Sequence, residues 1–304
     1  MPTAEVLRTE HETREGESGK EMGKIRILAD STCDLTPQML QQYGVQIVPL
    51  NIVLNDKAYQ DGVEIGPDEI YAWSEAHKTT PKTSAMTLGA AQEALSTCSE
   101  PGDDIICFCI SEQMSSAAQV MRLAAEDLPD RRVYVIDSQN LSTGIGLQVI
   151  YAAEQVQAGT PAEEIVRLTE QRRQKVRASF VVDTLTYLYR GGRCNAVTAL
   201  VGNALQLKPK IVVQDGKMGV SKKYRGKTAA IVQKYAQDLQ EQLLNADARR
   251  VFVTHSGMPD GIVEQTVAYL QSLHYFEEVL TSRAGGVISS HCGPGTLGVL
   301  FYTK

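Results

Sequence analysis

The chain lacks the sequence features of several common classes of protein. No stretch approaches the roughly 20 apolar residues of a membrane-spanning helix, which argues against a transmembrane protein. The phosphate-binding patterns GxxxxGK[ST] and GxGxxG after a strand are missing, and so are the motifs HExxH and GxSxG of zinc proteases and serine hydrolases. Aromatic residues make up only 6% of the chain and do not accompany its basic residues, which disfavours nucleic-acid binding.

Cysteine and histidine are present without the spacing of a metal site. The six cysteines form no CxxC pair, the five histidines are scattered, and neither a metal nor a cofactor is predicted. Most of the cysteines lie within apolar runs, which is typical of buried free thiols in a reducing compartment. The expected location is therefore the cytoplasm.

The length and composition favour a folded protein with two lobes. The chain has 304 residues, of which 43% are hydrophobic and 22% are charged. This length exceeds the size at which one hydrophobic core usually stops growing. A ligand site between two lobes is then a natural expectation. Residues 1–23 differ, with six Glu, three Lys or Arg and no aromatic residue, and are predicted to form a disordered acidic tail.

A basic region occupies the middle of an otherwise acidic chain. Residues 167–227 hold fourteen Lys or Arg against three acidic residues, or +11, so the remainder must sum to about −17 to give the net charge of −6. One interpretation is an ordinary solvated surface. The other is a docking face for an acidic partner or for phosphates.

The apolar periodicity predicts an α/β fold. Short β-branched runs such as 25–29, 105–110 and 133–136 alternate with amphipathic stretches, which favours a largely parallel sheet with flanking helices. A long apolar helix over 141–158 ends at Gly159-Thr160-Pro161, which predicts a lobe boundary. We therefore expect an N-terminal α/β lobe over 24–159 and a C-terminal α/β lobe over 160–304.

Hydroxyl side chains gather at the predicted strand ends. Ligands of open parallel sheets bind outside the carboxyl ends of the strands. Helix N-capping is the competing explanation for each hydroxyl taken alone. Several of them converging beside helix N-termini would form a site for a small anion such as a carboxylate. The candidates are Asp30-Ser31-Thr32, Thr83-Ser84, Ser111, Ser115-Ser116 and Asp137-Ser138.

A glycine-rich segment near the C-terminus places a histidine in an unusual setting. Residues 285–298 contain five glycines and one proline, and we predict a tight loop between closing strands at 286–288 and 297–302. His291 lies at the centre of this segment. It is either structural or a hydrogen-bond donor to an anion.

A serine hydrolase or acyltransferase is the alternative function. Ser115 or Ser256 would be the nucleophile, with His255 or His291 as the base. Spacing alone identifies no acidic third member of a triad.

Ordered motifs along 24–304 resemble the DegV family of bacterial fatty-acid-binding proteins. Each motif is weak alone, but the ordered set is specific. The matching segments are Asp30-Ser31-Thr32-Cys33-Asp34-Leu35, Pro81-Lys82-Thr83-Ser84, Val135-Ile136-Asp137-Ser138 with Ser142 and Gly144-Ile145-Gly146, Leu188-Tyr189-Arg190-Gly191-Gly192-Arg193, Leu207-Lys208-Pro209 and His291-Cys292-Gly293-Pro294-Gly295.

The resemblance implies a lipid-binding protein rather than an enzyme. A long-chain fatty acid would lie in a tunnel between the lobes and be presented to a separate ATP-dependent kinase that makes acyl phosphate for phospholipid synthesis. Transient contact with a membrane surface is also expected, and nucleic acid is not. Thr83, Ser115 and His291 would hold the carboxylate, with Ser84 and Ser31 beside them, and Arg190 and Arg193 would face the kinase. Ser116, at a position where the chain departs from the family pattern, would add one more hydroxyl near the carboxylate.

The chain departs from the family pattern at two places beside these residues. Ser115-Ser116-Ala117-Ala118 stands where many members have Ser-Gly-Thr-Tyr, and Ala85-Met86 replaces a Gln-Pro type of continuation. Details of the pocket are therefore expected to differ.

Overall fold

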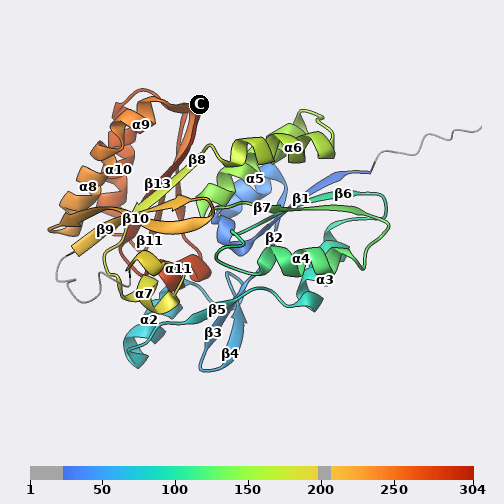
Figure 1. Cartoon of the computed structure of the whole chain (residues 1–304), viewed down its shortest axis with the longest axis horizontal. Coiled ribbons are helices and arrows are strands. Elements are labelled where there is room, and N and C mark those ends of the chain that lie inside the picture. Colours follow the sequence, from blue (N-terminus) through green and yellow to red (C-terminus); the bar gives the residue numbers. More distant parts are fainter. Residues whose placement is uncertain (1–22, 198–206) are drawn as a thin grey trace, which may run out of the picture.

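The computed structural model describes residues 23–197 and 207–304. The predicted acidic tail therefore lies, apart from Gly23, outside the described residues. Two sheets with their helices form the two lobes, and a small third sheet lies below them (Figure 1). Within the described part of the chain, no helix is long and apolar enough to cross a membrane.

The first sheet is parallel, as the alternation of strands and helices predicts. Its strand order is β2-β1-β6-β7, and every neighbouring pair runs in parallel. All six residues of β6 are buried, as expected for a strand covered on both faces. The bounds are β1 Ile25–Asp30, β2 Val45–Val48, β6 Asp104–Cys109 and β7 Arg132–Asp137.

Helices cover both faces of the first sheet. The helices α3 (Leu88–Cys98) and α4 (Ala117–Ala125) pack below it, whereas α5 (Thr143–Gln157) and α6 (Ala162–Arg173) pack above it (Figure 1). The short segments η1 (Ser31–Cys33) and α1 (Pro37–Tyr43) connect β1 to β2. Although α6 follows the boundary predicted at residue 159, it contacts β6 and β7 of the first sheet.

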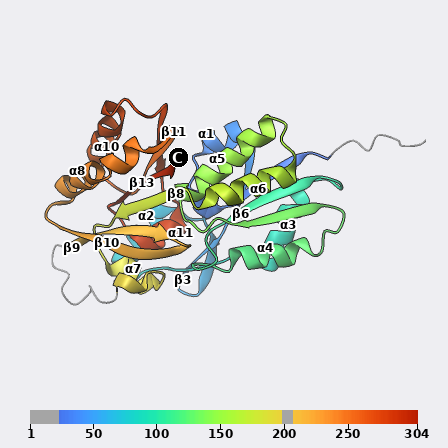
Figure 2. The same cartoon turned by 45° about the horizontal axis from the view of Figure 1, so that its top comes forward.

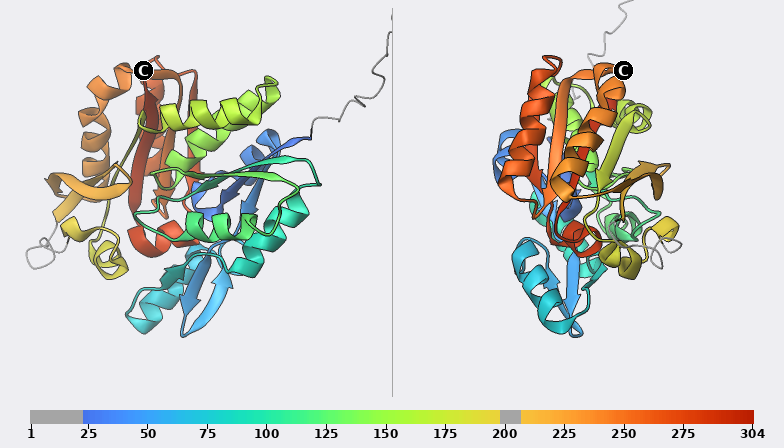
Figure 3. Two further views of the ribbon diagram at one scale, coloured as in Figure 1. Left: turned by 45° about the vertical axis from the view of Figure 1, so that its right-hand side comes forward. Right: turned by 90° about the vertical axis from the view of Figure 1, so that its left-hand side faces the viewer.

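A small antiparallel sheet and one helix project from the first lobe. The strand order is β4 (Lys57–Gln60), β3 (Asn51–Leu54), β5 (Lys82–Ser84), and α2 (Pro67–His77) lies beside them. Both views in Figure 3 show this unit below the two larger sheets. Its importance is that β5 carries Thr83 and Ser84.

The second sheet is mixed and has six strands in the order β10-β9-β8-β13-β11-β12. Its strands are β8 (Val176–Val181), β9 (Leu207–Gln214), β10 (Lys217–Arg225), β11 (Ala246–Ser256), β12 (Glu278–Arg283) and β13 (Thr296–Thr303). The sequence analysis did not identify β10 or β12. The helices are α7 (Thr186–Gly191), α8 (Thr228–Asp238), α9 (Gln240–Leu244), α10 (Asp260–Ser272) and α11 (Gly286–Cys292).

The predicted strand at 286–288 is wrong, because these residues form the first turn of α11. Two carboxylates from the first lobe bind the amide groups of this turn: Asp34 Oδ1 accepts from Gly285 at 2.8 Å and Asp61 Oδ1 accepts from Gly286 at 2.7 Å. Acidic groups stabilise a helix N-terminus by satisfying its free amides. His291 consequently lies on the last turn of a helix, not in a loop.

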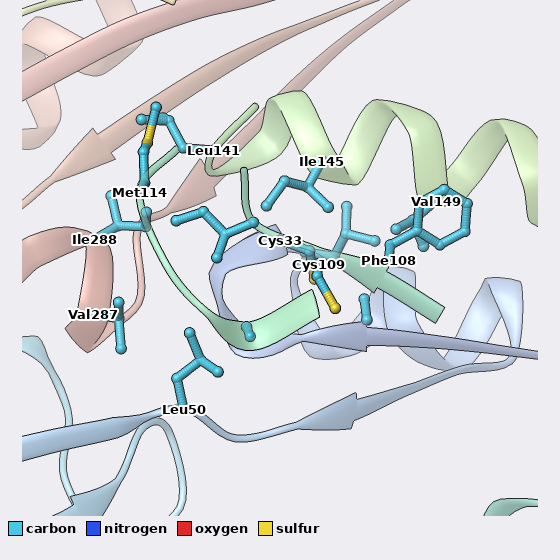
Figure 4. Packing of buried hydrophobic residues seen from close by; sticks show 14 of the residues in the cluster. Cys33, Leu50, Phe108, Cys109, Met114, Leu141, Ile145, Val149, Val287 and Ile288 are labelled. Atoms are coloured by element: carbon cyan, nitrogen blue, oxygen red, sulfur yellow. The ribbon is translucent and has the colours of Figure 1, made fainter. Parts of the chain in front are cut away.

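The largest hydrophobic cluster spans both lobes. It joins Phe108 and Val149 of the first lobe to Phe180 and Leu300 of the second sheet. Figure 4 shows part of it, with side chains from several elements gathered around one region between the lobes. All six cysteines are buried and free, as the apolar runs around them predict.

Candidate functional site

A cavity of about 240 Å³ lies where β5, α11 and the segment after β6 meet. Five of the six residues predicted to bind a carboxylate line it, although they come from distant parts of the sequence. Among the described residues, no carboxylate side chain lines it. The lining residues are Leu50, Thr83, Ser84, Ala85, Ile110, Met114, Ser115, Ser116, Leu141, Arg193, Met218, Val287, Ile288, His291 and Cys292.

His291 and Thr83 form the polar centre of the cavity. The His291 Nε2 atom lies 2.7 Å from Thr83 Oγ1. His291 Nδ1 is buried and, within the described residues, has no hydrogen-bond partner. Because a buried N–H without a partner is rarer than a buried acceptor without one, we assign the proton to Nε2. The Thr83 hydroxyl then accepts from His291 and keeps its own proton to donate into the cavity.

The imidazole of His291 is neutral at ordinary pH. Burial lowers its pKa to about 4, and the positive charge of Arg193 acts in the same direction. A neutral ring can donate from Nε2 without bringing a charge into the cavity.

Glycine at position 191 makes room for this ring. A Cβ atom built on Gly191 would lie 2.3 Å from His291 Nδ1. Gly192 follows as the C-cap of α7 with φ +66°, and its amide donates to the carbonyls of Leu188 and Tyr189. The Gly-Gly pair therefore ends a helix. It also holds α7 against the histidine.

Ser115 combines a local role with a place in the cavity. Its Oγ accepts from the Ala117 amide at 3.2 Å, which is a capping contact at the start of α4. Ser84 and Ser116 line the cavity from β5 and from the residue before α4. The hydroxyls thus come from two separate segments that both line the cavity.

Arg193 lies at the same cavity, whereas Arg190 does not. Backbone carbonyls hold the Arg193 side chain, with Nη1 2.9 Å from Gly191 O and Nε 3.4 Å from Met114 O. Arg190 is exposed and its Nη1 donates to the carbonyl of Lys78 at 3.3 Å. The family resemblance placed both arginines on one partner-binding surface. The sequence could not separate them, because the direction of each side chain depends on how the segment packs in the folded protein.

The inner wall of the cavity is apolar and leads toward a second space. Leu141, Ile288 and Cys292 line both the first cavity and a smaller one of about 30 Å³ that continues between the lobes. In Figure 4, Met114, Leu141 and Ile288 lie close together at one end of this apolar region. The arrangement is amphipathic, with hydroxyls, imidazole and guanidinium at one end and hydrocarbon at the other.

Ser31 does not line the cavity, contrary to its predicted place among the carboxylate-binding hydroxyls. Its Oγ donates to Asp61 Oδ2 at 2.8 Å and accepts from the Leu50 amide at 3.2 Å. The Ser31 hydroxyl therefore donates its proton to the nearby carboxyl group of Asp61 and not to a ligand in the cavity. Ser31 supports the segment that holds α11.

Asp34 and Asp61 are the positioning residues that the sequence analysis missed. Besides binding the first turn of α11, Asp34 accepts from the Ser142 hydroxyl and its carbonyl accepts from Ser282. Burial raises the pKa of Asp34 to about 8 and also raises the pKa of Asp61. The two carboxyl groups tie the helix that carries His291 to the first lobe. In the sequence, Asp34 was only part of a segment that matches the family, and Asp61 was not singled out.

The predicted alternative, a serine nucleophile with a histidine base, lacks its defining contact in the described residues. Ser256 donates to the carbonyl of Gly293, and the Nδ1 atom of His255 accepts from the Met258 amide at 3.3 Å. Ser115 and His291 share the cavity, but the hydrogen bond of His291 is to Thr83. Within the same residues, no group of three or more His, Cys, Asp or Glu side chains is placed to hold a metal ion.

The chain is similar to one known protein family over most of its length. Residues 24–304 match the family model described as "Uncharacterised protein, DegV family". A DegV domain-containing protein of Deinococcus radiodurans is 34% identical over 277 residues, covering 90% of this chain and 97% of that protein.

Solved structures show the same fold. A DegV family protein from Thermus thermophilus, described with fatty acid binding, is 30% identical with a TM-score of 0.82, covering 92% of this chain and 100% of that one. A stearic acid-binding protein from Eubacterium ventriosum is 28% identical with a TM-score of 0.80, covering 92% of this chain and 98% of that one. The chain belongs to the DegV family.

Proposed function

We propose that this protein binds a long-chain fatty acid, with the carboxylate at Thr83, Ser115 and His291 and the acyl chain along the apolar wall. The observation that carries the proposal is the amphipathic cavity, whose lining in the described part of the chain has several hydrogen-bond donors, one cation and no carboxylate. The fatty acids bound by DegV proteins of similar fold support it.

The two ends of the ligand would contribute differently. Each buried CH₂ group contributes about 0.8 kcal/mol, so the acyl chain supplies most of the affinity. A carboxylate removed from water must still receive hydrogen bonds. Thr83 and Ser115 would donate their hydroxyl protons, and Arg193 would supply the opposite charge. The polar end therefore sets the orientation of the ligand.

The acyl chain would need both cavities. The first, at about 240 Å³, is smaller than the roughly 300–1,000 Å³ usual for ligand pockets. Leu141, Ile288 and Cys292 separate it from the second. Rotation of the Leu141 and Ile288 side chains would join the two spaces into one channel between the lobes.

Presentation to a separate kinase is the second part of the proposal. The polar end of the cavity lies beside exposed Arg193, so a carboxylate held there would be accessible to a partner. The cavity residues supply donors and one cation but, in the described chain, no Ser–His pair, which suits chemistry done by another protein. Arg190, exposed and outside the cavity, would belong to the kinase-facing surface.

The main experiment is denaturing extraction of the purified protein followed by mass spectrometry, with delipidation and reloading. We expect about one fatty acid per chain. The Ser115→Ala/Thr83→Val double variant should retain less fatty acid but bind the matching fatty alcohol as the wild type does, because only the carboxylate contacts are lost. Failure of the wild type to contain or take up any fatty acid would refute the binding proposal.

The kinase proposal has its own test. Arg190→Glu should reduce ATP-dependent acyl-phosphate formation by an added fatty-acid kinase without changing the fatty acid content. Lys57→Glu, the same charge reversal at an exposed lysine of β4, is the matched control. Equal rates for wild type and Arg190→Glu would place the kinase-facing surface elsewhere.

A further inference from the structure

A second and larger cavity lies between the lobes, away from the proposed fatty acid site. Its volume is about 470 Å³, and it shares no lining residue with the cavity that contains His291. One wall comes from Gln139, Asn140, Arg173 and Gln174 of the first lobe. The other comes from β8, the β9–β10 hairpin, Gln242 and Phe301 of the second lobe. We call it the interlobe groove.

The hairpin of β9 and β10 closes one side of the groove. Figure 2 shows this orange hairpin extending from the second sheet toward the first lobe. Its turn is fixed there because the Ser111 hydroxyl donates to the Gly216 carbonyl at 2.8 Å. The groove is therefore formed by two lobes that are in contact.

Lys210, on β9, is the most unusual residue of the groove. The residue is only 9% exposed. Its Nζ atom lies 5.7 Å from the centre of the Tyr235 ring, and the described structure contains no carboxylate within ion-pair distance of it. Burial lowers the pKa of Lys210, and Lys222 adds to this, although Asp238 opposes it. An ammonium group this buried is costly without an anionic partner.

Two arginines extend the positive charge of the groove. Arg173 Nη1 donates to the Asp137 carbonyl at 2.9 Å, and its Nε is buried and unpartnered in the described residues. Arg177 Nη1 donates to the carbonyls of Gln174 and Val176 at 2.8 and 3.1 Å. Carbonyl contacts orient both guanidinium groups without neutralising them.

Two basic residues near the groove, unlike its three cations, are paired with carboxylates. Arg172, next to Arg173 in the chain, forms an ion pair with Asp247 at 3.0 Å, and Lys222 forms one with Asp238 at 2.6 Å. Of the described residues that line the groove, three are cations and one is acidic, the exposed Asp215. Three positive charges and one negative charge leave a net charge of +2 in the groove.

The neutral lining groups complete a set suited to an oxyanion. Gln139, Gln174, Gln242 and Ser221 supply amides and a hydroxyl, while Val212 and Phe301 supply apolar contact. Guanidinium groups match the oxygens of phosphate in pairs, and a phosphate carries the multiple negative charge that this excess of cations requires.

We infer that the interlobe groove is a binding site for a small phosphorylated molecule, held by Lys210, Arg173 and Arg177. The ligand contacts both lobes, because Arg173 ends α6 on the first sheet and Lys210 belongs to the second. This site is independent of the proposed fatty acid site. It also gives part of the basic region a defined role.

Pyrophosphate is the probe for this site, and its binding to the full-length protein is measured by calorimetric titration. The ionic strength is kept constant with sodium chloride, so that the screening of charges by salt does not change during the titration. We expect saturable binding. Lys210→Met should weaken it at least about tenfold, since a charge-assisted contact is lost. The fold should survive, because the change removes an unpaired buried charge. Lys222→Met, in the adjacent strand and paired with Asp238, is the matched control and should bind as the wild type does.

Arg177→Gln provides a second variant if Lys210→Met does not fold. The Ser115→Ala/Thr83→Val variant should still bind pyrophosphate, so that failure of the fatty acid proposal and failure of this one are distinguishable. The inference is overturned by absence of saturable binding to the wild type. It is equally overturned by unchanged affinity in Lys210→Met, or by an equal loss in Lys210→Met and Lys222→Met.

Discussion

Substituting Gly191 by alanine tests the link between the Gly-Gly turn and the histidine. Gly191 is the last residue of α7 and has no positive φ, so alanine suits its backbone and by propensity alone would stabilise the helix by up to about 1 kcal/mol. The added methyl group, however, would lie 2.3 Å from His291 Nδ1. Packing and propensity therefore act in opposite directions.

The geometry indicates which effect prevails. Real Cβ atoms essentially never approach closer than 3.0 Å, so the imidazole must move by at least about 0.7 Å (3.0 − 2.3). Gly191 lies at the Nδ1 side of the ring and Thr83 at the Nε2 side, so a ring pushed away from Gly191 is forced against Thr83 Oγ1, and their 2.7 Å hydrogen bond cannot keep its geometry. Overpacking in a filled site costs about 1–3 kcal/mol. We expect Gly191→Ala to be destabilised overall, with a lower Tm.

The binding assay should compare a fatty acid with the fatty alcohol of the same chain length. Their affinity ratio isolates the carboxylate contacts from burial of the acyl chain. Hydrogen bonds to charged groups contribute about 1.5–3 kcal/mol, so disturbing the Thr83–His291 pair should reduce the acid preference by about tenfold or more. Affinity for the alcohol should change little.

Gly89→Ala is the matched control. Gly89 lies in the first turn of α3, and a Cβ atom there meets nothing within 4 Å. This variant should be as stable as the wild type or slightly more stable, with the same acid preference. If Gly191→Ala behaved like Gly89→Ala in both assays, the close packing of α7 on His291 would not matter, and the reasoning would be wrong.

Three further predictions concern other polar side chains. Burial raises the pKa of Asp34 to about 8 from 3.8, so the folded state holds its proton more tightly than the unfolded chain does. The stability contributed by the protonated Asp34 carboxyl group is complete below about pH 3.8 and is lost as the pH rises to about 8. In denaturant titrations across this range, the free energy of unfolding of Asp34→Asn should not show this decrease. A parallel decrease in the wild type and the variant would contradict the prediction. Thr143→Val should lower the free energy of unfolding by about 1–3 kcal/mol, because it leaves Thr254, the hydrogen-bond partner of Thr143 at 2.6 Å, unpaired. Adding Thr254→Val should restore much of this stability. If urea unfolding shows that the effects of the two substitutions simply add, the contact does not contribute as proposed. Arg193→Gln should lower the preference for fatty acid over fatty alcohol without affecting alcohol binding, and an unchanged ratio would remove Arg193 from the carboxylate site.

Local sequence patterns predicted most of the fold and the edge of the sheet at which the site residues come together. Alternating β-branched and amphipathic segments predicted a parallel first sheet, and the structure confirms the parallel pairing of its strands. Because the carboxyl ends of parallel strands share one edge, the Ser115-Ser116 segment after β6 could be placed near other strand-end hydroxyls. Thr83 and His291 were candidates from the residues alone, and the resemblance to DegV proteins assigned them to a carboxylate. The structure brings these residues to one cavity.

Rules of local sequence were wrong where a distant group decided the outcome. Residues 286–288 are apolar enough for a strand, but amide contacts with Asp34 and Asp61 stabilise a helix there. Ser31 resembles the other strand-end hydroxyls in sequence, yet Asp61 takes its hydrogen bond. In each case the deciding partner lies 30 or more residues away.

The sequence by itself determined the α/β class, the two lobes and most of the hydroxyls available for an anion, because periodicity and strand-end chemistry act over a few residues. Only the tertiary structure decided that His291 would lie on a helix, that Arg193 would line its cavity, and that Lys210 would be buried without a carboxylate. Those outcomes depend on which side chains meet after folding. Burial then sets the charge of His291 and the cost of leaving Lys210 unpaired.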